Sequence, residues 1–331
     1  MGRRVSATFF HYRYAGHRLA SALPLPELPV LPAGPDPDFV VETFESTVIP
    51  ASGTVEWQHN FTDAHGAHAF RCFRVGDAYG FDFPCVAQAW VTADNRIALS
   101  RSFESSIESL RHVLLDQVLP RVLAQRRQVL LHGAAVHTRQ GRTLLMIGDS
   151  GMGKSTLAAA FACSGAEVLS DDGVLLDFSG RNVRAVACYS GLRLWPDSLS
   201  TVMAERAAES TPMSHYNEKR RLIQPIAGDA RHGIDAILLL QRRSDAITFA
   251  PVGAQAACMA LVANAFQLDL GDHANLRRLL ARTAEAVRRI PVLALAYPRD
   301  YALLPEVVRR IEAEVAGSAT PPKTRATARV R

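Results

Sequence analysis

The sequence predicts an α/β protein that consists of a β-rich N-terminal region and a mixed α/β core built around a glycine-rich loop. Three observations predict this fold class. Residues 1–103 contain short alternating apolar and polar stretches, separated by proline- and glycine-rich turns. Residues 146–157, MIGDSGMGKSTL, have the glycine and lysine spacing of a loop that holds phosphate groups. From residue 128 onward, short apolar stretches of strand length are combined with helix-like segments.

The N-terminal region, residues 1–103, is expected to fold mainly into strands. Stretches such as DFVVETFES, HAFRCFRV, YGFDF and RIALS alternate with the period of a strand and are rich in β-branched and aromatic residues. Residues 21–32, SALPLPELPVLP, carry too many prolines for a central strand, so we expect them to run extended along a surface. Residues 104–127 have apolar residues at helical spacing. They predict a connecting helix with a kink or break at Pro120.

The core, residues 128–316, begins with two predicted strands, residues 129–138 and 142–148, joined by a short turn. The short strands that follow the loop helix resemble a β-meander more than the regular alternation of a dinucleotide-binding fold. The remaining elements are expected in this order: a helix at 155–164, strands at 166–170, 171–178, 182–188, 234–242 and 246–252, two helices within 253–289, a strand at 291–298 and a closing helix at 300–315.

The net charge of +5 is concentrated at the end of the chain. Segment 317–331 contains no acid and four basic residues, which are Lys323, Arg325, Arg329 and Arg331. Without these four, 33 of the 37 basic residues remain against 32 acidic ones, so the rest of the chain is nearly neutral. This balance argues against nucleic acid as a partner. The tail is predicted to be disordered, and both a solvated terminus and a contact with an acidic partner are compatible with its composition.

The composition is that of an ordinary globular protein of 331 residues, with 48% hydrophobic and 21% charged residues. No apolar run approaches the length of a membrane span, and the first residues lack the apolar segment of a signal peptide, so no membrane partner is expected. The five cysteines form no CxxC motif and no metal-ligand spacing, which predicts reduced, mostly buried thiols in a cytoplasmic protein.

The glycine-rich loop predicts a site for ATP. Gly148 is followed after four residues by Gly153, Lys154 and Ser155, and the expected loop is completed by Asp149, Ser150, Gly151, Met152 and Thr156. Glycines allow a tight turn whose N–H groups point at phosphate oxygens, and Lys154 brings a positive charge to the β- and γ-phosphates. The Ser155 hydroxyl can bind Mg²⁺, and the phosphates would lie at a helix N-terminus, which favours anions.

A phosphoryl-transfer site also needs carboxylates, and Asp171 and Asp172 are the candidates. The apolar strand 234–242 has no acid at its end, which argues against a motor protein or a GTPase switch. The Asp171–Asp172 pair lies one helix and one short strand beyond Ser155, so it can return to the phosphate end of the loop. Two adjacent carboxylates can divide the roles of proton acceptor and metal ligand. Asp-Asp-Gly is also a good turn sequence, and a purely structural turn stays open.

Residues 132–176 resemble the core of bacterial HPr kinase/phosphorylase, a P-loop kinase family that is also related to ATP-dependent PEP carboxykinase. The shared features are His-Gly at residues 132–133, the sequence GDSGMGKS, a helix that ends in Ser-Gly, and the Asp-Asp pair. The resemblance implies that Asp171 is the catalytic acid or base, that Asp172 and Ser155 hold Mg²⁺, and that His132 lies beside the catalytic Asp. A hydrogen-bonded core histidine is the alternative for His132.

Beyond residue 176 the sequence departs from that family. The segment that would recognise HPr is not recognisable, and the N-terminal region differs as well. YRYAGHRLASALPLPEL, LRLWPDSL and KRRL look more like HPr-kinase-like proteins of peptide-modification gene clusters, some of which phosphorylate a serine of a lasso-peptide precursor. Arg193, Lys219 and Arg220 are candidates for contacts with the γ-phosphate or an acidic acceptor, and Lys219 is one of only three lysines in the chain. Solvated surface charges are the alternative for all three.

The sequence therefore predicts an ATP- and Mg²⁺-dependent kinase that acts on a serine-type hydroxyl of a peptide or protein. Three alternatives stay open: a small-molecule kinase of the same fold, an HPr serine kinase/phosphorylase, and a nucleotide-binding sensor without enzymatic activity. Acceptor identity, a reverse phosphorylase reaction, ATP or GTP preference and assembly into a homo-oligomer are not determined by the sequence.

Overall fold

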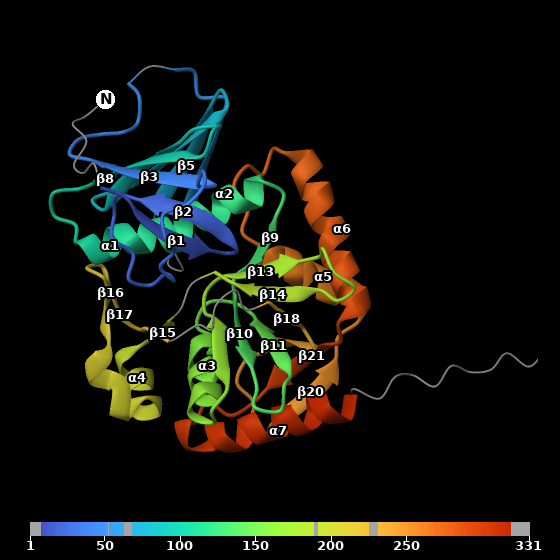
Figure 1. The fold of residues 1–331 in the computed structure, drawn as a ribbon. Coiled ribbons are helices and arrows are strands. Elements are labelled where there is room, and N and C mark those ends of the chain that lie inside the picture. The colour runs from blue at the N-terminus through green and yellow to red at the C-terminus, as the bar shows by residue number, and fades with distance from the viewer. Residues whose placement is uncertain (1–7, 52, 63–67, 189–190, 225–230, 319–331) are drawn as a thin grey trace, which may run out of the picture.

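The computed structural model describes residues 8–51, 53–62, 68–188, 191–224 and 231–318. These residues form a mixed α/β fold with four sheets, of eight, six, four and three strands (Figure 1). The eight-stranded sheet is built from the N-terminal part of the chain and lies above the other three in the view of Figure 1. The fold class expected from the sequence, a mixture of α and β with several sheets, is therefore confirmed.

The N-terminal sheet has the strand order β1-β2-β3-β8-β7-β6-β5-β4. β3 pairs in parallel with both of its neighbours, and the other pairs are antiparallel. β4 forms one edge of the sheet and pairs with β5. The strands are β1 Phe10–Tyr14, β2 His17–Ser21, β3 Phe39–Phe44, β4 Trp57–Thr62, β5 His68–Val75, β6 Ala78–Phe83, β7 Ala87–Val91 and β8 Arg96–Arg101.

The proline-rich segment 21–32 faces the N-terminal core with one side and solvent with the other, where Pro24, Pro26, Val30 and Pro32 are exposed. Leu23, Leu25 and Leu28 are buried in the N-terminal core, and Glu27 is buried in an ion pair with Arg221. The segment forms no central strand and runs along the surface of the N-terminal core, as the sequence predicts, but its leucine side chains are turned inward and buried. The backbone of this segment finds partners outside a regular ladder, as in the bonds from Arg13 N to Pro29 O and from Leu25 N to the Tyr12 hydroxyl.

The connecting helix continues through Pro120 without a break. It consists of α1 Ile107–His112, a π-helical stretch η1 Val113–Val118 and α2 Leu119–Gln125. Proline has no N–H to donate to the preceding turn, and the π-helical stretch, in which Leu119 N bonds to Leu114 O, adapts the helix to this loss just before Pro120. The predicted kink or break is therefore replaced by a local widening of the helix.

The six-stranded sheet carries the glycine-rich loop. Its strand order is β12-β10-β11-β19-β21-β20, and β11, β19 and β21 are parallel to one another. Residues of β10 and β11 alternate between two apolar clusters, so these strands are buried on both faces, and this explains their continuous apolar sequences. The strands are β10 Gly133–His137, β11 Thr143–Ile147, β12 Glu167–Ser170, β19 Ala236–Leu240, β20 Thr248–Pro251 and β21 Val292–Ala296.

Helices cover both faces of this sheet. α3 Lys154–Cys163 and α7 Leu304–Ser318 pack in one apolar cluster, and α5 Ala254–Ala263 and α6 His273–Arg289 pack in the other (Figure 1). A short 3-10 turn, η3 Tyr301–Leu303, precedes α7. The last helix includes Gly317 and Ser318, the first two residues of the predicted tail, and residues 319–331 lie outside the described part of the chain.

The four-stranded sheet, in the order β18-β14-β13-β9, is joined to the six-stranded one by three direct connections, β9 to β10, β12 to β13 and β18 to β19, and the first two of them lie at the site. Residues 129–138, predicted as one strand, divide at His132 into β9 and β10, which belong to different sheets. The chain makes a second crossing at Asp171–Gly173, between β12 and β13. The pairings Leu131↔Val174 and Ala135↔Ser170 place the two crossings next to each other. The strands are β9 Val129–Leu131, β13 Val174–Asp177, β14 Arg184–Ala187 and β18 Arg231–Gly233.

The three-stranded sheet, in the order β15-β17-β16, is formed by the segments LRLWPDSL and KRRL and their neighbours, whose sequence departs from the family resemblance. It lies beside the glycine-rich loop, because β15 and the following helix both contact α3. Its elements are β15 Leu192–Leu194, α4 Pro196–Val202, the 3-10 turn η2 Ala204–Glu209, β16 Thr211–Ser214 and β17 Asn217–Leu222.

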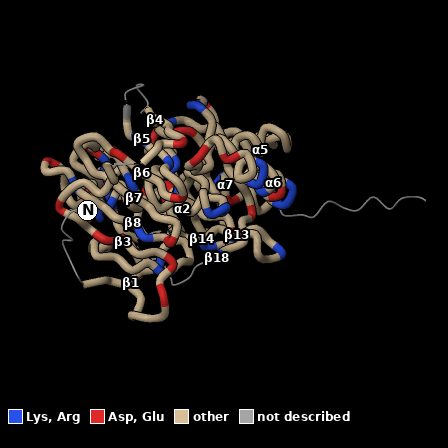
Figure 2. The backbone as a smooth tube through the Cα atoms, turned by 90° about the horizontal axis from the view of Figure 1, so that it is seen from above, with Lys and Arg blue, Asp and Glu red and all other residues tan. Residues whose placement is uncertain are grey.

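Basic and acidic residues are interspersed over the described elements, as Figure 2 shows. This distribution agrees with the nearly neutral body of the chain calculated from its sequence. None of the described helices is both long and apolar enough to cross a membrane. Of the five cysteines, Cys72, Cys188 and Cys258 are buried, whereas Cys85 and Cys163 are exposed.

Candidate functional site

The glycine-rich loop connects β11 to α3, as the sequence predicts. Gly148, Gly151 and Gly153 have φ angles of +148°, +81° and +83°, which glycine adopts much more readily than other residues. The backbone also needs space at both ends of the loop. A Cβ at Gly148 would lie 3.2 Å from the carbonyl oxygen of Leu240, and a Cβ at Gly153 would lie 2.6 Å from Nη1 of Arg299. The positive φ favours glycine at both positions, and at Gly148 the nearby backbone oxygen of Leu240 adds to this preference.

Lys154 begins α3, and its side chain folds back over the loop. Its ammonium donates to the carbonyl oxygens of Gly148 and Asp149, at 2.6 and 3.0 Å, and the residue is only 5% exposed. Burial lowers the pKa of Lys154, and the negative charges of Asp172 and Asp171 oppose this shift. These two hydrogen bonds hold the Lys154 ammonium against the backbone of the loop.

Asp171 is completely buried behind the loop. Its Oδ1 accepts hydrogen bonds from the Ser155 hydroxyl at 3.0 Å and from the backbone N–H of Asp172 at 3.1 Å, and its Oδ2 accepts from the backbone N–H of Arg193 at 2.9 Å. Burial, followed by the negative charge of Asp172, raises the pKa of Asp171 to about 6. The carboxylate therefore lies where an additional positive charge would stabilise its ionised form.

Asp172 faces the pocket, and its backbone is in the left-handed region with a φ of +69°. Its Oδ2 lies 3.4 Å from Nε of Arg193, and its Oδ1 lies 3.6 Å from Nδ1 of His132. Burial acts to raise the pKa of Asp172, but the positive charges of Arg193, His132, Lys219 and Lys154 outweigh it and hold the pKa well below its ordinary value. Asp172 is therefore the more acidic member of the pair.

His132 lies at the crossing between the two sheets, beside Asp172. Its Nδ1 donates to the Asp172 carbonyl oxygen at 3.2 Å, and its backbone N–H donates to Asn264 O at 2.6 Å. Burial lowers the pKa of His132, and the charge of Asp172 opposes this shift. The neighbours of the two carboxylates are thus the reverse of those that the family resemblance implies, because His132 lies beside Asp172 and Ser155 is bonded to Asp171.

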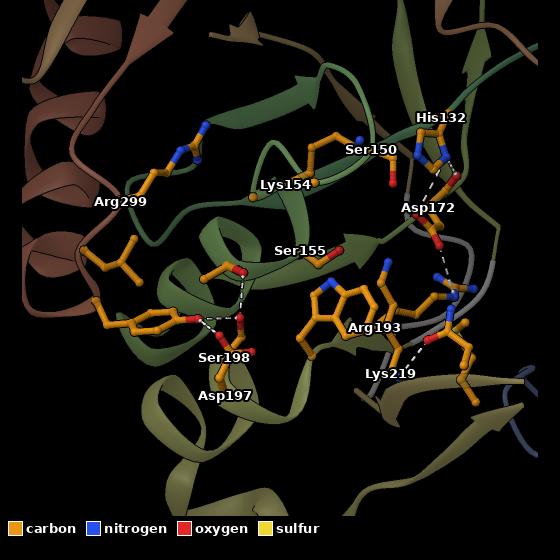
Figure 3. Close-up of a pocket in the computed structure, with 18 of the residues that line it drawn as sticks. His132, Ser150, Lys154, Ser155, Asp172, Arg193, Asp197, Ser198, Lys219 and Arg299 are labelled. Atoms are coloured by element: carbon orange, nitrogen blue, oxygen red, sulfur yellow. Dashed lines mark hydrogen bonds and ion pairs between the residues drawn. The ribbon is translucent and has the colours of Figure 1, made fainter. Parts of the chain in front are cut away.

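The loop and the carboxylates meet at a pocket of about 730 Å³. Figure 3 shows Asp172, His132, Arg193 and Lys219 at one end of it and Asp197, Ser198 and Arg299 at the other, with Ser155 between them. The members of the predicted loop that line the pocket are Ser150, Gly151, Gly153, Lys154, Ser155 and Thr156. Of the other three, Met152 packs against the core formed with α3, whereas Gly148 and Asp149 contribute the carbonyls that hold Lys154.

The three predicted positive groups have different environments. Lys219 lines the pocket, with its Nζ 5.6 Å above the ring of the exposed Trp195. Arg193 also reaches the pocket, but it is fully buried and its guanidinium is bonded to the carboxylate of Asp116. Arg220 points elsewhere, since its guanidinium donates twice to Ser210, at 2.7 Å each. Successive residues of β17 point to opposite faces, which separates Arg220 from Lys219.

Several pocket residues were not singled out from the sequence. Tyr301 donates to Asp197 Oδ2 at 2.8 Å and lies 2.9 Å from the Ser198 hydroxyl, and Arg299 donates to the Tyr297 hydroxyl at 2.7 Å. The sequence carried a signal for them, because WPDS at 195–198 is a helix start and YPRDY at 297–301 follows a strand directly. Each segment follows the carboxyl end of a strand, β15 or β21. Ligands of α/β proteins often bind at the carboxyl ends of strands.

Replacing Gly153 by Ala is expected to lower the unfolding temperature more than replacing Gly151. Both glycines have positive φ, which costs about 1–2 kcal/mol for another residue. Only at Gly153 would the new Cβ also meet Arg299, since a Cβ at Gly151 has nothing within 4 Å. Thermal unfolding of the two variants measures the difference. Equal losses would show that the contact between the loop and Arg299 has no energetic effect, and Arg299→Ala in the G153A background should recover part of the loss.

Comparisons with known proteins give weak similarity of structure and none of sequence. No family model matches the chain, and no curated protein matches it at the significance level used. Among solved structures, the chain is similar to the HPr(Ser) kinase/phosphatase from Coxiella burnetii, with a TM-score of 0.29 and 10% identity over 57% of this chain and 93% of that one. A likeness this weak carries no weight for the activity of this chain, which has to follow from the geometry of the site.

Proposed function

We propose that this chain is an ATP- and Mg²⁺-dependent kinase that transfers the γ-phosphate to a serine-type hydroxyl of a peptide or protein. The observation that carries the proposal is the composition of one pocket. Lys154 and Ser155 of a phosphate-binding sequence line it together with the carboxylate of Asp172 and the ammonium of Lys219. Phosphoryl transfer depends on positioning and on charge stabilisation, and these are the groups that supply both.

The phosphates of ATP would be held at the start of α3. The first residues of this helix line the pocket, and the helix dipole and the Lys154 ammonium favour the negative charge of the β- and γ-phosphates. The end of the pocket with Tyr297, Arg299 and Tyr301 offers aromatic rings and hydroxyls, which suit a nucleoside. The opposite end, with Asp172 and Lys219, is then left for the acceptor.

The residues present fit a magnesium ion beside Ser155 and Asp171. Ser155 lines the pocket and Asp171 lies behind it, 3.0 Å from the Ser155 hydroxyl, so the hydroxyl oxygen would hold the ion and the Asp171 carboxylate would orient that hydroxyl. Mg²⁺ in such sites is held by one or two protein groups and by phosphates. When bound, the ion neutralises charge on the phosphate oxygens.

We assign Asp172 to the acceptor hydroxyl and Asp171 to the metal side. Asp172 reaches the pocket and is held ionised, whereas Asp171 is completely buried and bonded to Ser155. The Asp172 carboxylate would accept the hydrogen bond of the hydroxyl and orient its oxygen. As that oxygen bonds to the γ-phosphorus, the bond to the β–γ bridging oxygen breaks, ADP leaves and the proton passes to Asp172.

A peptide acceptor is supported by two features of the described structure. Lys219 adds a positive charge beside the exposed Trp195 at the acceptor end, which suits a segment with an acidic residue near the hydroxyl. A flexible segment can also place its hydroxyl in line with the phosphorus without remodelling a folded substrate. The edge strand β4 of the N-terminal sheet offers backbone groups for pairing with an extended peptide. A small-molecule acceptor is the second candidate, since a pocket of about 730 Å³ is of a size typical for small ligands.

The acceptor is tested by incubating the protein with Mg·ATP and, separately, with a lasso-type precursor peptide, with HPr and with a panel of small alcohols. Mass spectrometry is expected to show a gain of one phosphate on the peptide. Phosphorylation of an alcohol alone would establish the small-molecule alternative, and phosphorylation of HPr at serine would establish the HPr kinase. ATP binding without transfer to any acceptor would favour a nucleotide-binding sensor.

A further inference from the structure

A buried carboxylate in the connecting helix is joined to the candidate active site. Asp116 is 5% exposed and lies in the π-helical stretch η1 among apolar residues that include Leu114 and Leu115. Its Oδ1 lies 2.5 Å from Nη2 of Arg193, and its Oδ2 accepts a hydrogen bond from Nδ1 of His112. A buried charge is tolerated only when it is paired, so these two contacts determine where the Asp116 side chain lies.

The guanidinium of Arg193 connects Asp116 to both carboxylates of the site. Its Nη1 donates to the Asp171 carbonyl oxygen at 2.5 Å, and its Nε lies 3.4 Å from Oδ2 of Asp172. Arg193 is fully buried, and its backbone N–H holds Oδ2 of Asp171. A planar guanidinium has a fixed donor geometry, so the position of Asp116 sets the angle at which Arg193 meets the Asp pair.

The second partner of Asp116, His112, lines the same pocket. His112 lies one helical turn earlier and has its Nδ1 held by Asp116. This bond fixes the ring orientation of His112 and turns the other ring nitrogen away from Asp116. Asp116 therefore supports two pocket residues, one beside the carboxylate pair and one on the connecting helix.

The position of Asp116 depends on the N-terminal half of the chain. Tyr14 of β1 donates to the Leu115 carbonyl at 3.2 Å, and Arg221, which pairs with Glu27, lies 3.8 Å from Oδ2 of Asp116. The widened turn of η1 is thus held by contacts from β1 and from the proline-rich segment. π-Helical turns are frequent at functional sites, which fits a role beyond connecting two regions.

We propose that Asp116 is a positioning residue for phosphoryl transfer, which holds Arg193 against Asp171 and Asp172 and holds His112 at the pocket wall. The inference rests on the proposed kinase activity and extends it by a residue that does not touch the reacting atoms. Its consequence is that the N-terminal half is required for an ordered carboxylate pair, because η1 belongs to the helix that joins the two halves.

The test replaces Asp116 by Asn in the full-length chain, which keeps the shape and removes the charge. The control is Asp269→Asn, the same change at an equally buried acid that pairs with Arg74 at 3.3 Å and does not line the pocket. Both variants should lose thermal stability. Only D116N should lower kcat, by roughly 10- to 100-fold, with KM for ATP changed much less, as is typical when a group that orients an active-site residue is removed.

A second measurement separates failure of this inference from failure of the proposed function. The Mg²⁺ dependence of ATP binding is measured by fluorescence titration, which needs no acceptor. D116N should require several-fold more Mg²⁺ than the unchanged protein, because Arg193 no longer fixes Asp171, whereas D269N should not. If the unchanged protein transfers no phosphate, the kinase proposal fails and the titration alone decides the role of Asp116. The inference is overturned if folded D116N keeps the kcat of D269N, or if the two variants share one Mg²⁺ dependence.

Discussion

Asp172→Asn is expected to reduce phosphoryl transfer by roughly 10²- to 10⁴-fold and to leave ATP binding close to normal. The substituted amide keeps the shape of the side chain but cannot accept the proton of the acceptor hydroxyl. Asp172 is the carboxylate that faces the pocket, beside His132 and Lys219, so its loss should affect kcat more than the affinity for nucleotide. Steady-state kinetics and a nucleotide titration on the same preparation measure the two effects.

Asp171→Asn provides the comparison within the same pair. Asp171 is bonded to the Ser155 hydroxyl, so its replacement should raise the Mg²⁺ concentration needed for half-maximal transfer. Saturating Mg²⁺ should restore part of the rate in D171N and none of it in D172N. The opposite pattern, with D172N rescued by Mg²⁺ and D171N inactive at every concentration, would restore the assignment that the family resemblance implies.

Lys154→Ala is expected to remove most nucleotide affinity and nearly all transfer. Losing a charged hydrogen-bonding partner of the phosphates costs about 1.5–3 kcal/mol, which corresponds to roughly 10- to 100-fold in affinity. Transfer should fall further, since the same ammonium stabilises charge that develops as the phosphoryl group moves. Isothermal titration with Mg·ATP measures the affinity, and a transfer assay measures the rate.

The structure adds a cost in stability to the Lys154 variant. The ammonium donates to the carbonyls of Gly148 and Asp149, and burial leaves these oxygens without an easy replacement, so unfolding should become about 1–3 kcal/mol easier. The control is Arg309→Ala, which removes one positive charge from the exposed side of α7 and should change neither affinity nor rate. Unchanged ATP binding by folded K154A would remove the basis of the proposed function.

The local part of the site could be predicted from the sequence. The strand before the loop is continuously apolar, and the helix after it is rich in alanine. Glycine permits the turn between them, so these local patterns are sufficient to predict a strand, a tight loop and a helix. The interval from Ser155 to Asp171 holds one helix and one short strand, and such a unit returns the chain to the loop. That unit explains why the Asp171–Asp172 pair lies beside Ser155, although not which of the two carboxylates bonds to it.

The exact neighbours of the Asp pair were not contained in the sequence. Residues 129–138 have one uninterrupted strand pattern, yet His132 is where the chain passes from one sheet to another. An apolar pattern shows that a strand is buried but not which partner it pairs with. Only the pairings of β9 with β13 and of β10 with β12 place His132 beside Asp172 rather than Asp171.

The environments of the charged residues also depend on contacts between distant parts of the chain. From the sequence alone, Arg193 and Arg220 are both cations of the segment that departs from the family, and both were candidates for phosphate contacts. The tertiary structure gives Arg193 a buried carboxylate from a helix 77 residues earlier, and it turns Arg220 toward Ser210. Neighbouring residues of a strand point to opposite faces, so only one of Lys219 and Arg220 can reach the pocket. Which one does so is known only from the tertiary structure. The sequence by itself thus determined the loop between a buried strand and a helix, because glycine and the apolar pattern act locally. Only the folded chain decided which charges meet at the loop, because a charge is oriented by partners that lie far away in the sequence.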